Sequence, residues 1–95
     1  MAQEPTITVY VTSALRAYTD GASEFALSAT SMRTAIAQIE GRYPALYRNI
    51  CDETGAVRRH LNLFVNSSNV RDLAGLDSAL APGDVVTILP AVSGG

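Results

Sequence analysis

Hydrophobic and polar residues alternate along three stretches of the chain, residues 6–12, 24–28 and 61–66. A period of two is the spacing of a β-strand with one buried face. The run Val85–Leu89 is rich in β-branched residues, which is typical of a buried strand. A turn at Asp20-Gly21 would join the first two strands as a hairpin. The side chains that we expect to face the core are Ile7, Val9, Val11, Phe25, Leu27, Leu61, Leu63, Val65, Val86 and Ile88.

A single apolar stripe at helical spacing follows the hairpin and consists of Met32, Ala35, Ile36 and Ile39. Thr30 or Ser31 is suited to cap the start of this helix. Gly41 is expected to end the helix and Pro44 to prevent its continuation. Residues 45–51 resemble a short helical turn.

The later part of the chain predicts a brief strand at Val70–Leu73 and a helical turn around Leu76 and Leu80. The predicted fold class is therefore α+β, with a mixed sheet of four to five strands and one main helix packed on one face. If the first and last strands are neighbours, they run parallel at the centre, which is the β-grasp (ubiquitin-like) roll. We expect one domain over residues 1–90 and a flexible tail over residues 91–95.

Composition excludes several classes of protein. The single Cys51 allows no intramolecular disulfide and suits a reducing compartment. No apolar run is long enough to span a membrane and Met1–Pro5 is polar, so we expect a cytoplasmic protein with no membrane partner. The seven basic residues are all arginine and are spread along the chain, so we expect no nucleic-acid partner.

The sequence offers no catalytic group. His60 is the sole histidine and lies at a polar junction, where a surface role is the common one. Cys51 has no second cysteine nearby, and Asp52-Glu53 is typical of a solvated loop. We therefore predict a protein that is not an enzyme and that binds neither a metal nor a cofactor.

The residues after Pro90 are small or neutral and end in Gly94-Gly95. Terminal glycines often simply fray. Because glycine has no Cβ, such an end also fits a channel too narrow for other residues and presents an unhindered carboxylate.

Residues 80–95, with the Pro82-Gly83-Asp84 turn, the strand, Pro90 and Gly94-Gly95, resemble the ending of ubiquitin-like sulfur carrier proteins. Those proteins serve thiamine, molybdopterin and cysteine biosynthesis. Phe64-Val65-Asn66 is a second, weaker match. The ending is most similar to the cysteine-pathway carriers, whereas Leu89 departs from the aromatic residue usual in molybdopterin subunits.

The resemblance implies that Gly95 is the sulfur-carrying residue, with Gly94 giving the tail its reach. An adenylating enzyme related to ubiquitin-activating enzymes would use ATP to activate the Gly95 carboxylate, which a sulfur source then converts to a thiocarboxylate. The implied acceptor is a cysteine synthase-like enzyme, and a metalloprotease would process any longer form. The residues expected to contact partners are Tyr10, Phe64 and Leu89 on the outer sheet face, followed by Pro90, Val92 and Ser93.

Three other functions stay open at this point. The chain would be the small subunit of molybdopterin synthase, or a protein modifier joined through Gly95 to target lysines, or a β-grasp interaction domain with an idle tail. A modifier without lysine could not build isopeptide chains on itself.

Overall fold

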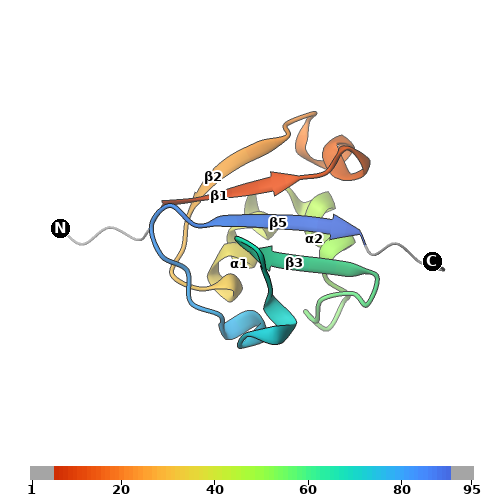
Figure 1. The fold of residues 1–95 in the computed structure, drawn as a ribbon. Helices are drawn as coiled ribbons and strands as arrows, with labels where there is room; N and C mark the ends of the chain where they lie inside the picture. The colour runs from red at the N-terminus through yellow and green to blue at the C-terminus, as the bar shows by residue number, and fades with distance from the viewer. Residues whose placement is uncertain (1–5, 91–95) are drawn as a thin grey trace.

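A five-stranded mixed sheet, covered on one face by helices, forms the body of the computed structural model, which describes residues 6–90 (Figure 1). The sheet order is β2-β1-β5-β3-β4. β1 and β5 run parallel at the centre and the other neighbours are antiparallel, which confirms the predicted β-grasp roll. The strands are β1 (Thr6–Val11), β2 (Glu24–Ser28), β3 (Leu61–Val65), β4 (Ser68–Asn69) and β5 (Val85–Pro90).

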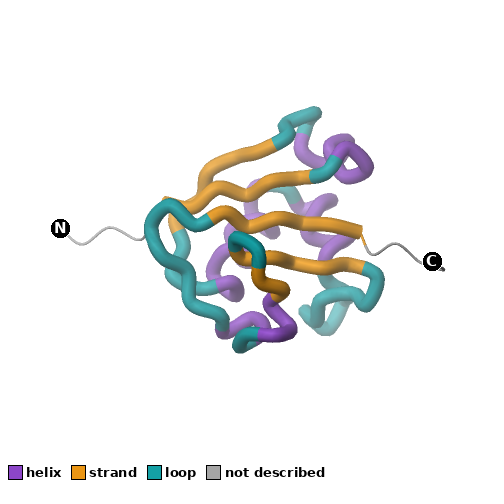
Figure 2. The backbone as a smooth tube through the Cα atoms, in the orientation of Figure 1, coloured by secondary structure: helices purple, strands orange, loops and turns teal. Residues whose placement is uncertain are grey.

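The main helix, α1 (Met32–Arg42), lies behind the sheet in Figure 2. Ser31 caps it, because its Oγ accepts a hydrogen bond from the Thr34 amide at 3.2 Å. The helix continues past Gly41, so the expectation that Gly41 ends it is wrong. Pro44 begins a second short helix, α2 (Pro44–Ile50), because a proline has the φ of a first helical turn and needs no N–H there.

Three 3-10 helices fill the connections. η1 (Ser13–Thr19) lies in the hairpin connection, where only a turn was expected. η2 (Val70–Asp72) replaces the strand predicted at Val70–Leu73, and η3 (Gly75–Asp77) follows it. The prediction of a strand was wrong because the Asn69 side chain accepts a hydrogen bond from the Arg71 amide at 2.9 Å, which turns the chain locally.

The core lies between the sheet and the helices. All ten strand residues predicted to face inward are buried, and so is the whole apolar stripe of α1. Cys51 is buried with them. No helix in residues 6–90 has the length and apolar character needed to cross a membrane.

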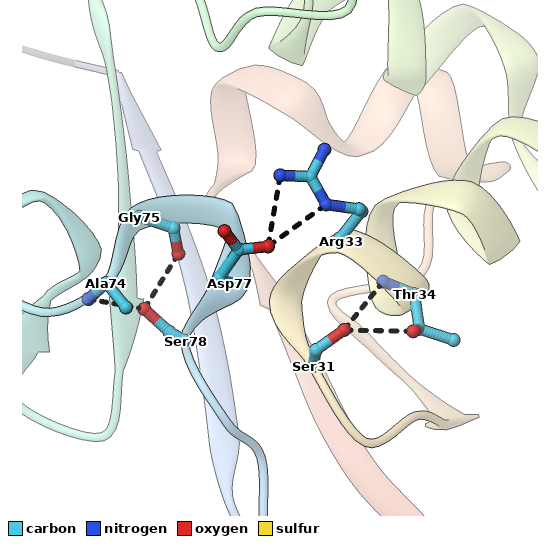
Figure 3. Close-up of polar contacts among 7 residues, drawn as sticks. All are labelled: Ser31, Arg33, Thr34, Ala74, Gly75, Asp77 and Ser78. Carbon is cyan, nitrogen blue, oxygen red and sulfur yellow. Dashed lines mark hydrogen bonds and ion pairs between the residues drawn. The ribbon is translucent and has the colours of Figure 1, made fainter.

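The segment that leads into β5 is fastened to the start of α1 (Figure 3). The Met32 amide donates to the Ser78 carbonyl at 2.9 Å, and Arg33 forms an ion pair with Asp77 at 3.1 Å. The Ser78 hydroxyl is buried and donates to the Gly75 carbonyl at 2.7 Å. Since α1 is itself packed on the sheet, these contacts fix where β5 begins.

Candidate functional site

The outer face of the sheet carries the large side chains that the sequence placed there. Tyr10 on β1 and Phe64 on β3 both pair in register with Thr87 of β5, so the three residues form a row across the sheet. Tyr10 is 42% exposed and Phe64 is half-buried. Their neighbours in sequence are buried, which confirms that this face points away from the helices.

Leu89 lies on the same face, two residues further along β5, and pairs with Asn62 of β3. It is half-buried. The row and Leu89 together form a strip, apolar except for the Thr87 hydroxyl, that follows the central strand toward its last residue. We call Tyr10, Phe64, Thr87 and Leu89 the outer strip.

Val85 was not among the residues expected on the outer face, where only Leu89 of the run Val85–Leu89 was placed. It is 37% exposed and pairs with Thr8. It extends the outer face at the start of β5. The alternation of Val85, Thr87 and Leu89 against the buried Val86 and Ile88 was the signal that could have shown this.

Pro90 is the last residue of β5 and pairs with Leu61 at the start of β3. The strand therefore ends at Pro90, one residue later than predicted. Val92, Ser93, Gly94 and Gly95 lie outside the described residues. The division into a domain over 1–90 and a tail over 91–95 stays a prediction.

A polar network lies beside the outer strip. The Arg71 guanidinium donates to Asn62 Oδ1 at 2.5 Å and to the Leu61 carbonyl at 2.8 Å. The side-chain Nδ2 of Asn69 also donates to Asn62 Oδ1, at 3.3 Å. This network connects η2 to the start of β3.

The candidate reactive groups do not gather at this face. His60 is exposed at the start of β3, and burial raises the pKa of the Cys51 thiol, which keeps it protonated. Hydrogen bonds from Thr54 hold the pKa of Asp52 below its usual value. No group of histidine, cysteine and acidic side chains in residues 6–90 is arranged to hold a metal ion. An open hollow of about 410 Å³ lies on the helix side, lined in part by Glu40, Tyr47, Arg48, Cys51 and Arg58.

Comparison with known proteins gives one family. The model of the ThiS family matches residues 9–95. The sulfur carrier protein CysO of Mycobacterium tuberculosis is 36% identical over 91 residues, which cover 94% of this chain and 98% of the relative.

Solved structures agree with this result. The crystal structure of Mycobacterium tuberculosis CysO matches with a TM-score of 0.84 at 35% identity, covering 90% of this chain and 99% of that chain. A chain of the Amycolatopsis orientalis BexX/CysO complex matches with a TM-score of 0.85 at 31% identity, covering 94% and 99%. Small archaeal modifier protein 1 of Methanosarcina acetivorans matches with a TM-score of 0.83 at 30% identity, covering 99% and 100%.

The sheet order and the parallel central pair are those of a β-grasp, ubiquitin-like domain, with the outer strip leading to the end of its central strand. The chain belongs to the ThiS family. The predicted membership of the ubiquitin-like sulfur carriers, and the likeness to the CysO type among them, are confirmed.

Proposed function

We propose that this chain carries sulfur for cysteine biosynthesis as a thiocarboxylate on Gly95. The observation that supports this most is the similarity to CysO, which extends over 94% of the chain. In the given sequence Gly94-Gly95 follows Pro90, the last residue of the strand that the outer strip follows, after three intervening residues.

The chemistry requires a partner enzyme, because a carboxylate is a poor electrophile. The Gly95 carboxylate attacks the α-phosphorus of ATP on an adenylating enzyme and releases pyrophosphate. Sulfide then attacks the acyl-adenylate carbonyl, displaces AMP and leaves the thiocarboxylate. The sulfur next attacks an activated substrate on a cysteine synthase-like acceptor. We expect this in the cytoplasm, where ATP is available and thiols stay reduced.

In this proposal the chain is a carrier that catalyses nothing and needs no bound cofactor. Its contribution is a surface that lets each enzyme place the sulfur by binding the whole domain. Tyr10, Phe64 and Leu89 supply the apolar part of that surface, and Pro90 would extend it at the end of β5. Val92 and Ser93 would line the entrance of the partner's active site. If the encoded chain extends beyond Gly95, a metalloprotease must first expose this residue.

Intact-protein mass spectrometry tests the proposal. The chain is incubated with the adenylating enzyme of its own organism, ATP and sulfide. We expect a mass increase of one sulfur-for-oxygen exchange, localised to Gly95 by fragmentation. A chain with one extra residue after Gly95 is the matched control and should stay unmodified. Equal thiocarboxylate yield from both chains would exclude Gly95 as the site.

A second candidate function is protein modification. The likeness to small archaeal modifier protein 1 of Methanosarcina acetivorans favours it, at 30% identity over 99% of this chain. The adenylated Gly95 would then form an amide with a lysine of a target protein. Covalent adducts of the chain in a cell extract, in place of a thiocarboxylate, would identify this function.

A further inference from the structure

Arg71 is an exposed arginine whose guanidinium is held in place by uncharged oxygen atoms. It donates to Asn62 Oδ1 at 2.5 Å and to the carbonyls of Leu61 at 2.8 Å and Arg58 at 3.3 Å. No carboxylate forms an ion pair with it within residues 6–90. Its positive charge is therefore fixed in position and not neutralised by this part of the chain.

The local fold explains why the side chain is ordered. Asn69 accepts a hydrogen bond from the Arg71 amide and sets the turn into η2. From η2 the Arg71 side chain reaches back to the start of β3. An unrestrained arginine side chain loses rotamer entropy when it binds a partner. The Arg71 side chain is already ordered by folding, so binding costs it less entropy. An ordered arginine is well suited to bind a carboxylate.

Arg71 binds the part of β3 that pairs with the last two residues of β5, after which the tail begins. Its two acceptors in β3 are Leu61, which pairs with Pro90, and Asn62, which pairs with Leu89. The guanidinium is thus bound to the start of β3, the strand that pairs with the last residues of β5. Any enzyme that binds the tail must approach this part of the surface.

The loop before β3 reaches Arg71 through its backbone, because the Arg58 carbonyl is one of the acceptors of Arg71. The Arg58 side chain is held elsewhere, since its Nε–H donates to the Arg48 carbonyl at 3.0 Å. In the same loop, Asp52 Oδ1 accepts hydrogen bonds from backbone amides and is occupied there. Asp72, the next residue in η2, is exposed and forms no ion pair in the described part of the chain.

We propose that Arg71 is a docking residue that binds a carboxylate on the surface of the adenylating enzyme. This inference rests on the proposed function. The Nε–H and one Nη1–H of Arg71 have no acceptor within residues 6–90, so the guanidinium has donors left for a partner. A charge-assisted hydrogen bond is roughly twice as strong as a neutral one, which makes an acidic side chain the matching group.

The test is the kinetics of adenylation by the adenylating enzyme of the same organism, followed as ATP–pyrophosphate exchange at several salt concentrations. Arg71→Ala should raise the KM for the chain about tenfold, leave kcat unchanged and flatten the salt dependence of KM. Arg71→Lys should recover part of the loss. Arg33→Ala is the matched control, because Arg33 is exposed but already ion-paired with Asp77 at the start of α1 (Figure 3).

A purely structural role predicts a different result. Arg71→Ala would then lower the melting temperature but leave KM and its salt dependence as in the wild type, measured well below the melting temperature of each variant. That result overturns the docking role alone. Failure of the wild-type chain to be adenylated would overturn the proposed function together with it.

Discussion

The strand register of β5 can be tested by a pair of identical substitutions at neighbouring residues. Val86 is 1% exposed and pairs with Val9 and Val65 on the inner face, whereas Val85 is 37% exposed on the outer face. Val→Ala removes two methyl groups in each case, so the change in β-propensity is shared and the difference reports burial. At about 0.8 kcal/mol per methylene, Val86→Ala loses about 1.6 kcal/mol of transfer free energy, and the cavity raises this to about 2–3 kcal/mol.

The assay is urea unfolding followed by far-ultraviolet circular dichroism. We expect Val86→Ala to lower the free energy of unfolding by that amount without changing the m-value, and to lower the melting temperature by about 10–15 °C. Val85→Ala should cost about 0.5 kcal/mol or less. An equal or larger cost for Val85→Ala would refute the register. A shift by one residue would place Leu89 in the core and remove it from the docking face.

Two further predictions concern docking and acid stability. Phe64→Ala should weaken binding of the adenylating enzyme by about 1–3 kcal/mol, measured by titration calorimetry, while the fold stays intact; an unchanged Kd would return Phe64 to an ordinary surface role. Asp52 accepts hydrogen bonds from the Thr54 hydroxyl at 2.6 Å and the Thr54 amide at 2.8 Å, which lower its carboxyl pKa from 3.8. Because the folded pKa is lowered, its contribution is present above about pH 4 and is lost as the pH falls further, so the melting temperatures of wild type and Asp52→Ala should converge in acid. A difference that stays constant with pH would contradict this.

Short-range patterns predicted the buried faces of the strands and of α1 correctly, because a period of two or of 3.6 residues assigns each side chain to a face of its own element. They failed where a side chain accepted a backbone hydrogen bond that a β-strand would have used. The Asn69 side chain turned the predicted strand at Val70–Leu73 into η2. They also failed at Gly41, which was expected to end α1 but lies inside it, whereas the short helical turn predicted after Pro44 is present as α2.

The candidate site was predicted in part for the same reason. Alternation placed Tyr10, Phe64 and Leu89 on one face, and the structure confirms that placement. Val85 was not assigned to a face, although its alternation with Val86 places it on the same face as Leu89. The role of Gly95 is inferred from the sequence of residues 80–95 alone. It is tested by whether a thiocarboxylate forms on that residue.

By itself, the sequence determined the family, the buried faces of the strands and of α1, and the ending that carries the proposed chemistry. Only the tertiary structure decided that β5 lies between β1 and β3, and that Leu89 therefore has Asn62 as its neighbour. It alone brought Arg71 to the Leu61 carbonyl, ten residues back along the chain. Periodicity assigns faces within one element but carries no information about which elements become neighbours, since that depends on how connections fold back over the sheet.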